Sequence, residues 1–421
     1  MFFFVTGRRV LTPEIRMYRP FFVPAFPLSK MKFVVAFNRN RDSYQVPLAL
    51  YEAGLLERLV TDFYMPPFLA RFALSRRSSH IPSSLVTGSA SALKLQLWDL
   101  RRAQSTRERA GVFCKLDIGL SKKAWSVAQQ TDAGLFLYSG YALEALKSAE
   151  QGPRRKILFV YHPQEAISGE LLRRDFERFP GVEKSYRIHE AEAQVLDGDR
   201  LLEEISLADE IVCASSFTRR SLGNIVKPVS VVPYGCDVVE IPPDEPSKSS
   251  AALEFLFVGQ GVQRKGLHHL LHVWARRGGD FGTLTVVSGQ IDPYMEAMCR
   301  DNPRVKLIRG LSATALTKKY RTSDVFVMPS LVEGFGLVYL EALAHGCYVI
   351  GSENSGIPDI EAPEFVARAV PAGDIGELES TLERTVRLFR AGEVSRSAIA
   401  TFARSRSWRA FRKAVVSIAS Q

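Results

Sequence analysis

Two glutamates, Glu333 and Glu341, stand eight positions apart in LVEGFGLVYLEALAHG, residues 331–346. Gly-Phe-Gly follows the first glutamate, although glycine is a poor residue with which to begin an ordinary helix. The preceding VFVMPS, residues 325–330, is typical of a buried strand, and residues 337–345 are typical of a helix. The stretch between them is therefore a strand-to-helix turn, where free backbone N–H groups favour hydroxyl or phosphate oxygens.

The spacing of the two carboxylates indicates the kind of ligand. Glu333 is expected to point from the loop into a ligand site, and Glu341 lies about 8 Å further along the helix axis than Gly336. Carboxylates so spaced suit a long polyhydroxyl ligand better than a single bond to be cleaved. A structural interpretation stays open, in which a glycine-rich turn precedes a helix with a surface glutamate.

Strand-like apolar runs alternate with helical patterns along the chain, which predicts parallel sheets covered by helices. In the first half, strands are predicted at residues 33–37, 134–138, 156–161, 210–214 and 229–232, with helices that include 47–59, 142–149 and 190–207. In the second half, strands are predicted at residues 253–259, 284–289, 305–310, 325–330 and 348–352. Each of these later runs stops at Gly or Ser, where a loop leaves the carboxyl end of a strand and ligands of open α/β sheets bind.

The alternation predicts two α/β domains whose parallel sheets face one another across a cleft. Residues 31–240 form the first Rossmann-like domain and residues 251–405 the second, joined by a Pro-, Asp- and Ser-rich linker at 241–250. Residues 406–421 are predicted as a short amphipathic helix. Residues 1–30 have their apolar residues before their charges, the wrong order for a secretory signal, and prolines at 20, 24 and 27 interrupt them. We expect this segment to be a disordered extension or an artefact of start-site choice.

Composition narrows the class of protein. At 421 residues, 46% hydrophobic and 24% charged, the chain is typical of a globular protein with more than one core. No apolar run reaches the about 18 residues needed to cross a bilayer. The five cysteines are scattered and never form Cys-x-x-Cys, which argues against a disulfide framework and a structural zinc site and predicts a cytoplasmic location.

The formal net charge of +10 is unevenly distributed. Residues 66–125 carry eleven Lys or Arg and three acidic residues, so most of the excess lies there. Such a stretch could bind an anionic membrane surface, which would place the protein peripherally at the inner face, or it could hold an acidic acceptor. A solvated surface with mobile loops is the alternative.

Several segments, in the same order, resemble the retaining glycosyltransferases of family 4, which have the GT-B arrangement of two Rossmann-like domains. Glu333 and Glu341 meet the Glu-x7-Glu signature, and FLFVGQGVQRKGLHHLL at 255–271 matches the phosphate-binding loop and its helix. ADEIVCASSFTRRSL and VSVVPYGCDVVEIPP match the end of the N-terminal domain, and SWRAF matches the helix that crosses back to it. The resemblance covers residues 31–415 and is strongest after residue 208.

The resemblance implies a nucleotide-sugar donor and a glycan or lipid-linked acceptor, without a metal or other cofactor and without a nucleic-acid partner. Lys265 is the leading candidate to hold the diphosphate, and Arg264 the second, since positive charge is needed where negative charge develops. The resemblance further implies that Glu341 binds the ribose and that Glu333 binds the transferred sugar. The other expected donor contacts are Gly259, Gln260, Gly334, Phe335, Gly336 and Leu337. An ordinary pair of exposed cations is the alternative for Arg264 and Lys265.

The chain departs from these relatives at three places. Gln260 stands where many have an arginine, so one phosphate contact is expected to be lost, with Arg264 as its replacement. NRNRDSYQ at 38–45 replaces a Gly-Gly loop, which predicts an unusual acceptor facing Asn38, Arg39 and Asn40. A histidine often found in the first domain is replaced by Tyr-Ser-Gly at 138–140, which leaves His162 as the candidate catalytic histidine. A loop histidine bonded to the backbone is the alternative there.

Two groups of residues could in principle bind a metal ion, but neither predicts a metal site. His268, His269 and His272 follow the phosphate-binding loop, but no carboxylate or cysteine is expected beside them, so packing is the preferred interpretation. Asp-Gly-Asp at 197–199 follows a helical pattern instead of a buried strand. No metal site is predicted.

The sequence therefore predicts a retaining glycosyltransferase of surface polysaccharide or glycolipid biosynthesis, with Glu333, Lys265 and His162 as its catalytic residues. A non-catalytic nucleotide-sugar-binding or scaffold protein of a polysaccharide-assembly complex is the alternative.

Overall fold

The computed structural model describes residues 31–65, 79–88, 90–150, 152, 154–195, 199–240 and 252–421, with the side chains of 90–95 left aside. The predicted N-terminal extension, the predicted linker and part of the basic stretch lie outside these residues. Residues 31–421 group into a single compact unit, so the domain boundaries stay a prediction.

The first sheet is parallel and has the strand order β3-β2-β1-β4-β5-β6-β7. Its strands are β1 (Phe33–Ala36), β2 (Leu56–Val60), β3 (Val86–Thr87), β4 (Gly134–Tyr138), β5 (Lys156–Val160), β6 (Glu210–Cys213) and β7 (Val229–Val231). The strands β1, β4, β5 and β6 are buried along their whole length, as expected for a sheet covered on both faces. The strands β2 and β3 lie on one side of β1, and the later strands β4 to β7 lie on its other side. The topological switch point is therefore between β1 and β4.

The second sheet is also parallel and has the order β10-β9-β8-β11-β12-β13. Its strands are β8 (Leu253–Val258), β9 (Gly282–Val287), β10 (Val305–Ile308), β11 (Val325–Val327), β12 (Tyr348–Ser352) and β13 (Ala367–Val370). The switch point of this sheet lies between β8 and β11. Two such sheets confirm the predicted fold class.

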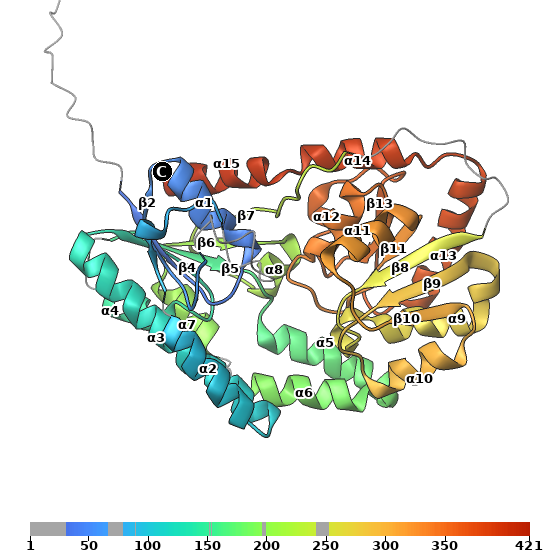
Figure 1. The fold of residues 1–421 in the computed structure, drawn as a ribbon, viewed down its shortest axis with the longest axis horizontal. Coiled ribbons are helices and arrows are strands. Elements are labelled where there is room, and N and C mark those ends of the chain that lie inside the picture. The colour runs from blue at the N-terminus through green and yellow to red at the C-terminus, as the bar shows by residue number, and fades with distance from the viewer. Residues whose placement is uncertain are drawn as a thin grey trace, which may run out of the picture. The chain divides into compact units, whose positions relative to one another are not determined.

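Helices connect the strands and cover the sheets (Figure 1). They are α1 (Gln45–Glu52), α2 (Ala90–Arg102), α3 (Thr106–Thr131), α4 (Leu143–Ser148), α5 (Glu165–Arg178), α6 (Glu183–Ala193), α7 (Asp199–Leu207), α8 (Ser216–Ser221), α9 (Leu267–Phe281), α10 (Pro293–Asp301), α11 (Ala313–Thr322), α12 (Leu337–Ala344), α13 (Ile375–Arg390), α14 (Arg396–Ser405) and α15 (Trp408–Ala419). No helix among the described residues is long and apolar enough to cross a membrane.

The predicted strands are all present, but two predicted helices are wrong. Residues 47–59 do not form one helix, because α1 stops at Glu52 and β2 follows. Gly54 makes the turn with a φ of 71°, a left-handed conformation that glycine adopts without strain. The helix predicted at 190–207 is two helices, α6 and α7, and residues 196–198 between them lie outside the described part.

The predicted C-terminal helix is α15, and it packs beside α1 of the first sheet (Figure 1). Arg412 on α15 forms an ion pair with Glu52, at 2.8 Å, and donates a hydrogen bond to Gln45, at 2.7 Å. The C-terminal end of the chain therefore packs against the first domain after the second sheet is complete.

Candidate functional site

The site begins where two loops meet at the switch point of the second sheet. The turn Gln263–Lys265 follows β8, and residues 328–336 follow β11. The Arg264 carbonyl accepts hydrogen bonds from the N–H groups of Leu331, at 2.9 Å, and Val332, at 3.2 Å. Only glycine fits at 266, because a Cβ there would lie 2.0 Å from the Pro329 carbonyl oxygen.

This pairing of loops brings Lys265 to Glu333. The Lys265 Nζ donates a hydrogen bond to a Glu333 carboxylate oxygen, and an Arg264 guanidinium nitrogen lies 3.9 Å from the same oxygen. Glu333 is 7% exposed, and the Lys265 side chain is 12% exposed. The structure therefore places the predicted sugar-binding carboxylate and the predicted phosphate-binding cations in one cluster, in which Glu333 is buried and Arg264 is partly exposed.

Burial and charge act against each other in this cluster. Burial opposes ionisation of Glu333, but Lys265 and Arg264 outweigh it and hold the pKa of the carboxyl below its ordinary value. Burial also lowers the pKa of the Lys265 ammonium group, against the attraction of Glu333. The two groups neutralise one another while no ligand separates them.

His162 lies at the end of β5, next to the Glu333 loop. Although the His162 side chain is exposed, desolvation by the protein packed around it and the positive charges of Arg264 and Arg41 lower the pKa of its imidazole to about 3. A Cβ added to Gly334 would lie 2.0 Å from the Tyr161 carbonyl oxygen and 3.3 Å from the His162 Nδ1. The loop that carries Glu333 thus lies directly against the carboxyl end of a first-sheet strand, and His162 is neutral there at physiological pH.

Hydrogen bonds from the segment that follows β6 hold the same loop. The Gly334 carbonyl accepts from the Ser215 hydroxyl, at 2.5 Å, and from the Thr218 hydroxyl, at 3.2 Å. Both donors lie at the start of α8. Gly334 is therefore held by segments that follow two strands of the first sheet, β5 and β6.

The remaining residues of the Gly-Phe-Gly turn offer backbone groups. Gly336 precedes the first residue of α12 with a φ of 89°, and Leu337 is half-buried at that first position. The Phe335 ring is buried and packs edge-to-face on Tyr234, with ring centroids 5.3 Å apart. Phe335 consequently contributes to the core through its side chain, and only its backbone could serve a ligand.

Glu341 occupies a separate position on α12. Its carboxylate accepts a hydrogen bond from the Tyr320 hydroxyl on α11, at 3.1 Å. Among the described residues, no hydrogen bond or ion pair joins it to Lys265 or Glu333. The two signature glutamates therefore occupy separate positions, and their roles toward an elongated ligand stay predictions.

The first two predicted donor contacts lie at the end of β8. The Gly259 N–H donates to the Val287 carbonyl, at 3.1 Å, and is used within the sheet. The exposed Gln260 amide lies 3.5 Å from the Gln290 side-chain oxygen. Their roles as ligand contacts stay predictions.

A pocket of about 520 Å³ opens beside the Glu333 loop. It is lined by residues that follow β5, β6 and β12, namely Ile167, Phe217, Arg220, Ser221, Glu353, Asn354 and Pro358. The Asn354 carbonyl accepts a hydrogen bond from the Glu333 N–H, at 3.1 Å, so the pocket wall and the candidate site share a backbone contact.

Residues 252–387 match the protein family described as glycosyl transferases group 1. This segment is a glycosyl transferases group 1 domain. It runs from the edge of β8 into α13 and includes Lys265, Glu333 and Glu341. The resemblance is confirmed as far as a GT-B glycosyltransferase family, and the narrower assignment to family 4 stays a prediction.

Curated relatives agree with the family over part of the chain. An MMP α-(1→4)-mannosyltransferase of Mycolicibacterium hassiacum is 29% identical over 167 residues, 37% of this chain and 38% of that protein. A GDP-mannose-dependent α-(1-6)-phosphatidylinositol monomannoside mannosyltransferase of Mycobacterium tuberculosis is 27% identical over 177 residues, 36% of this chain and 46% of that protein. The matched segment spans less than half the length of each of these relatives.

Solved structures support the fold along nearly the whole chain. Sucrose-phosphate synthase from Thermosynechococcus elongatus superposes with a TM-score of 0.61 at 17% identity, covering 92% of this chain and 98% of that one. A trehalose-6-phosphate synthase superposes with a TM-score of 0.59 at 14% identity, covering 93% of this chain and 99% of that one. At such identities the likeness establishes the GT-B fold alone.

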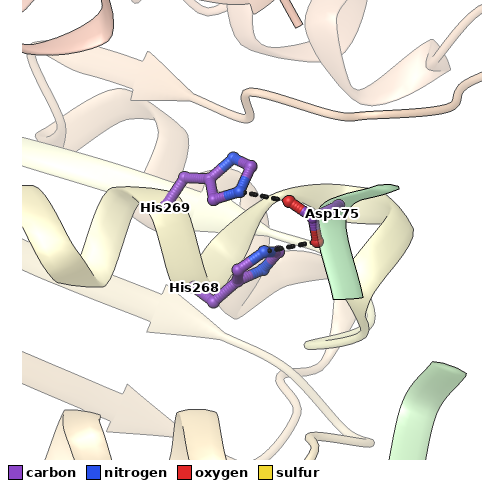
Figure 2. A group of neighbouring side chains, drawn as sticks. All are labelled: Asp175, His268 and His269. Atoms are coloured by element: carbon purple, nitrogen blue, oxygen red, sulfur yellow. Dashed lines mark hydrogen bonds and ion pairs between the residues drawn. The ribbon is translucent and has the colours of Figure 1, made fainter. Parts of the chain in front are cut away.

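The glycosyltransferase domain also takes part in a polar cluster that the sequence did not reveal. Asp175 on α5 lies between the two histidines that begin α9 (Figure 2). Its carboxylate oxygens lie 3.0 Å from the His268 Nε2 and 2.6 Å from the His269 Nε2. The Gln263 amide donates to the same carboxylate, at 2.8 Å. The expectation that no carboxylate lies beside these histidines is wrong.

The protonation and contacts of Asp175, His268 and His269 favour a hydrogen-bonded cluster over a metal site. Burial opposes ionisation of Asp175, but hydrogen bonds from the two imidazoles hold its pKa well below the ordinary range. Burial and the neighbouring His269 lower the pKa of His268 to about 4. Each carboxylate oxygen already faces an imidazole nitrogen, so a metal ion would have to displace both contacts. The cluster joins α5 to the turn that carries Lys265, and the absence of a metal requirement stays a prediction.

Proposed function

We propose that this protein is a retaining glycosyltransferase that moves a sugar from a nucleotide-sugar donor to a glycan or lipid-linked acceptor. The observation that carries the proposal is the buried Lys265–Glu333 pair, beside neutral His162 and the start of α12. The match to glycosyl transferases group 1 over the same residues supports it. The donor binds the second domain and the acceptor binds the first.

Each group has a task in the transfer. The bond between the anomeric carbon and the diphosphate oxygen breaks, and a bond from the same carbon to the acceptor oxygen forms. Lys265 and Arg264 stabilise the negative charge that develops on the diphosphate. The acceptor proton passes to the leaving phosphate, and Glu333 and His162 hold hydroxyls of the transferred sugar.

Retention of configuration follows from attack on the same face as the departing phosphate. The only carboxylate paired with the phosphate-binding cations is Glu333, among the residues whose contacts the structure describes. Because Lys265 and Arg264 hold it, Glu333 is a weak candidate for a covalent nucleophile. The two cations provide the positive charge that a divalent metal provides elsewhere, so the reaction is proposed to need no metal.

GDP-mannose is the first donor to test, because two of the relatives are mannosyltransferases by name and one is named for its dependence on GDP-mannose. UDP- and ADP-sugars are the comparison donors. Donor hydrolysis and transfer are measured in wild type, Glu333→Ala and Lys265→Ala. At least a hundredfold loss is expected in both variants. Equal background rates in wild type and variants, together with nucleotide-dependent thermal stabilisation, would instead identify a non-catalytic nucleotide-sugar-binding protein.

We further propose that helix α2 brings the enzyme to an anionic membrane surface and that its acceptor is lipid-linked. Leu97 and Trp98 on α2 are 48% and 50% exposed. The Arg102 guanidinium lies 3.3 Å from the centre of the Trp98 ring, and Arg101 is exposed beside it. Exposed apolar side chains interleaved with arginine suit the headgroup region of a bilayer. A location at the cytoplasmic face belongs to the same proposal.

Co-sedimentation with liposomes tests the membrane surface. Binding is expected to rise with the content of anionic lipid, fall with salt, and decrease at least fivefold in Trp98→Ala. Phe365→Ala is the matched control, because Phe365 is 45% exposed on the second domain. Binding that is independent of anionic lipid and of Trp98 would refute the proposal.

A further inference from the structure

The loop after β1 lies at the switch point of the first sheet, where it meets the loop after β4. The Tyr138 hydroxyl donates to the Asp42 carboxylate, at 2.5 Å, and the Tyr141 hydroxyl donates to the Asn38 side-chain oxygen, at 2.9 Å. Open α/β sheets bind ligands at this position. The loop is therefore placed to receive the second substrate of a two-domain transferase.

The backbone of this loop is strained. Arg39, Asp42, Ser43 and Tyr44 have φ values of 61°, 39°, 52° and 61°, in the left-handed region that non-glycine residues rarely adopt. Two other non-glycine residues in the described part of the chain share that region. Strain of this kind costs free energy and persists where the surrounding contacts enforce it, commonly at ligand sites.

Arg41 in this loop is a cation without an acidic partner. Its Nη2 donates to the Tyr141 hydroxyl, at 2.7 Å, and its guanidinium lies 4.4 Å from the centre of the Tyr161 ring. Its Nε is buried with no hydrogen-bond partner. Within the described residues, no carboxylate oxygen comes within the 4.0 Å of an ion pair with Arg41. A sequestered and unpaired guanidinium is unfavourable unless a ligand supplies the missing acceptor.

The acidic residues nearby are engaged elsewhere. The Asn38 amide donates to the Asp117 carboxylate, at 2.6 Å, which ties Asp117 into the chain that leads through Tyr141. Burial raises the pKa of Asp117 to about 7, and burial likewise raises the pKa of Asp42 to about 7. Both carboxyls are thus partly protonated at neutral pH and neutralise Arg41 incompletely.

We propose that Arg41 anchors a subsite for a phosphate or carboxylate group carried by the acceptor. The inference rests on the proposed glycosyl transfer, because it assigns the acceptor of that reaction. Tyr161 connects the subsite to the reaction centre, since its ring lies under Arg41 and its carbonyl faces Gly334. A guanidinium offers two parallel donors to such an anion, which fixes orientation as well as affinity. Arg39, exposed on the same loop, supplies a second positive charge.

Binding of inorganic phosphate tests the subsite without any need for turnover. The full chain carrying Arg264→Gln and Lys265→Met is the parent, because these changes remove the two cations that are proposed to hold the donor phosphate. Titration calorimetry is expected to show phosphate binding in the parent, at least tenfold weaker binding after Arg41→Gln, and an intermediate loss after Arg41→Lys. Arg174→Gln, at an exposed arginine on α5, is the control and should bind as the parent does. A parent that binds no phosphate, or an Arg41→Gln protein that binds it equally well, overturns the proposal.

Transfer assays then distinguish the source of the anion. With the nucleotide sugar that the wild type consumes, transfer is compared among mannose 6-phosphate, vesicles that contain phosphatidylinositol, and neutral methyl mannoside. One of the two anionic acceptors is expected to exceed methyl mannoside at least a hundredfold, and Arg41→Gln should raise the KM for that acceptor at least tenfold. If transfer to methyl mannoside is as fast as transfer to the two anionic acceptors, the inference is overturned. A wild type that consumes no donor refutes the proposed function, while the phosphate titration still decides the subsite.

Discussion

Gly334 lies so close to Tyr161 that a Cβ on Gly334 would be 2.0 Å from the Tyr161 carbonyl oxygen. This contact joins the loop that carries Glu333 to the strand end that carries His162. The two sheets therefore meet at the candidate reaction centre through a residue without a side chain. Any larger residue must push the loop or the strand away.

Gly334→Ala is expected to lower the free energy of unfolding by about 1–3 kcal/mol and to lower turnover at least a hundredfold, because the loop moves with Glu333. Chemical denaturation and the transfer assay measure the two effects. Gly111→Ala on α3 is the control, since nothing lies within 4 Å of a Cβ there. It should be neutral or slightly stabilising. Wild-type activity in Gly334→Ala would show that this contact does not position Glu333.

His162 is expected to stay neutral across the physiological range. Its pKa of about 3 lies below the ordinary value for histidine, so the folded protein binds fewer protons than the unfolded chain below about pH 6.5. The contribution of His162 to stability is present above that pH and is lost as the pH falls toward 3. Proton NMR, with His162→Asn to assign the resonance, should show no titration of His162 between pH 5 and pH 8. A midpoint near 6.5 would show that the packed loops and the charges of Arg264 and Arg41 do not lower the pKa of this exposed imidazole.

Asp175→Asn is expected to lower the free energy of unfolding by about 2–4 kcal/mol. The amide that replaces the carboxylate cannot accept hydrogen bonds from His268, His269 and Gln263 together, and a buried donor loses its partner. Asp301→Asn, at an exposed end of α10, is the control and should change stability by less than about 0.5 kcal/mol. Equal stability of the two variants would contradict the account. Stoichiometric zinc in the purified protein would show that the cluster is a metal site.

The sequence predicted the elements whose residues are uniformly apolar and missed those whose signals are mixed. β4, β5 and β12 are continuous buried runs and were predicted at almost the observed bounds. Glu57 and Arg58 interrupt β2, so residues 47–59 matched a helical pattern although two elements are present. The two-residue strand β3 is too short to leave a periodic signal.

The candidate site also has residues that the local sequence predicts and contacts that only the tertiary structure reveals. Lys265 and Glu333 each follow a buried strand at a glycine-containing turn, so local sequence was enough to select both. Their direct pairing depends on β8 and β11 being neighbours, which only the sheet order reveals. Asp175 meets His268 from 93 positions away, and one sequence carries no record of such pairs. The left-handed backbone around Arg41 could not be predicted from the sequence. The segment NRNRDSYQ contains no glycine, and tertiary contacts enforce its conformation.

The affinity for a nucleoside diphosphate tests most directly the claim that Lys265 and Glu333 share one donor site. Calorimetry with GDP, or with the diphosphate of whichever donor is consumed, compares wild type, Glu333→Gln and Lys265→Met. In the free protein the Glu333 carboxylate is paired with the Lys265 ammonium group and competes with the diphosphate for it. Glu333→Gln should therefore bind the diphosphate as tightly as wild type or more tightly, although its turnover is lost. Lys265→Met should bind at least tenfold more weakly. Unchanged affinity in Lys265→Met, or a loss of diphosphate affinity in Glu333→Gln as large as in Lys265→Met, would contradict the account.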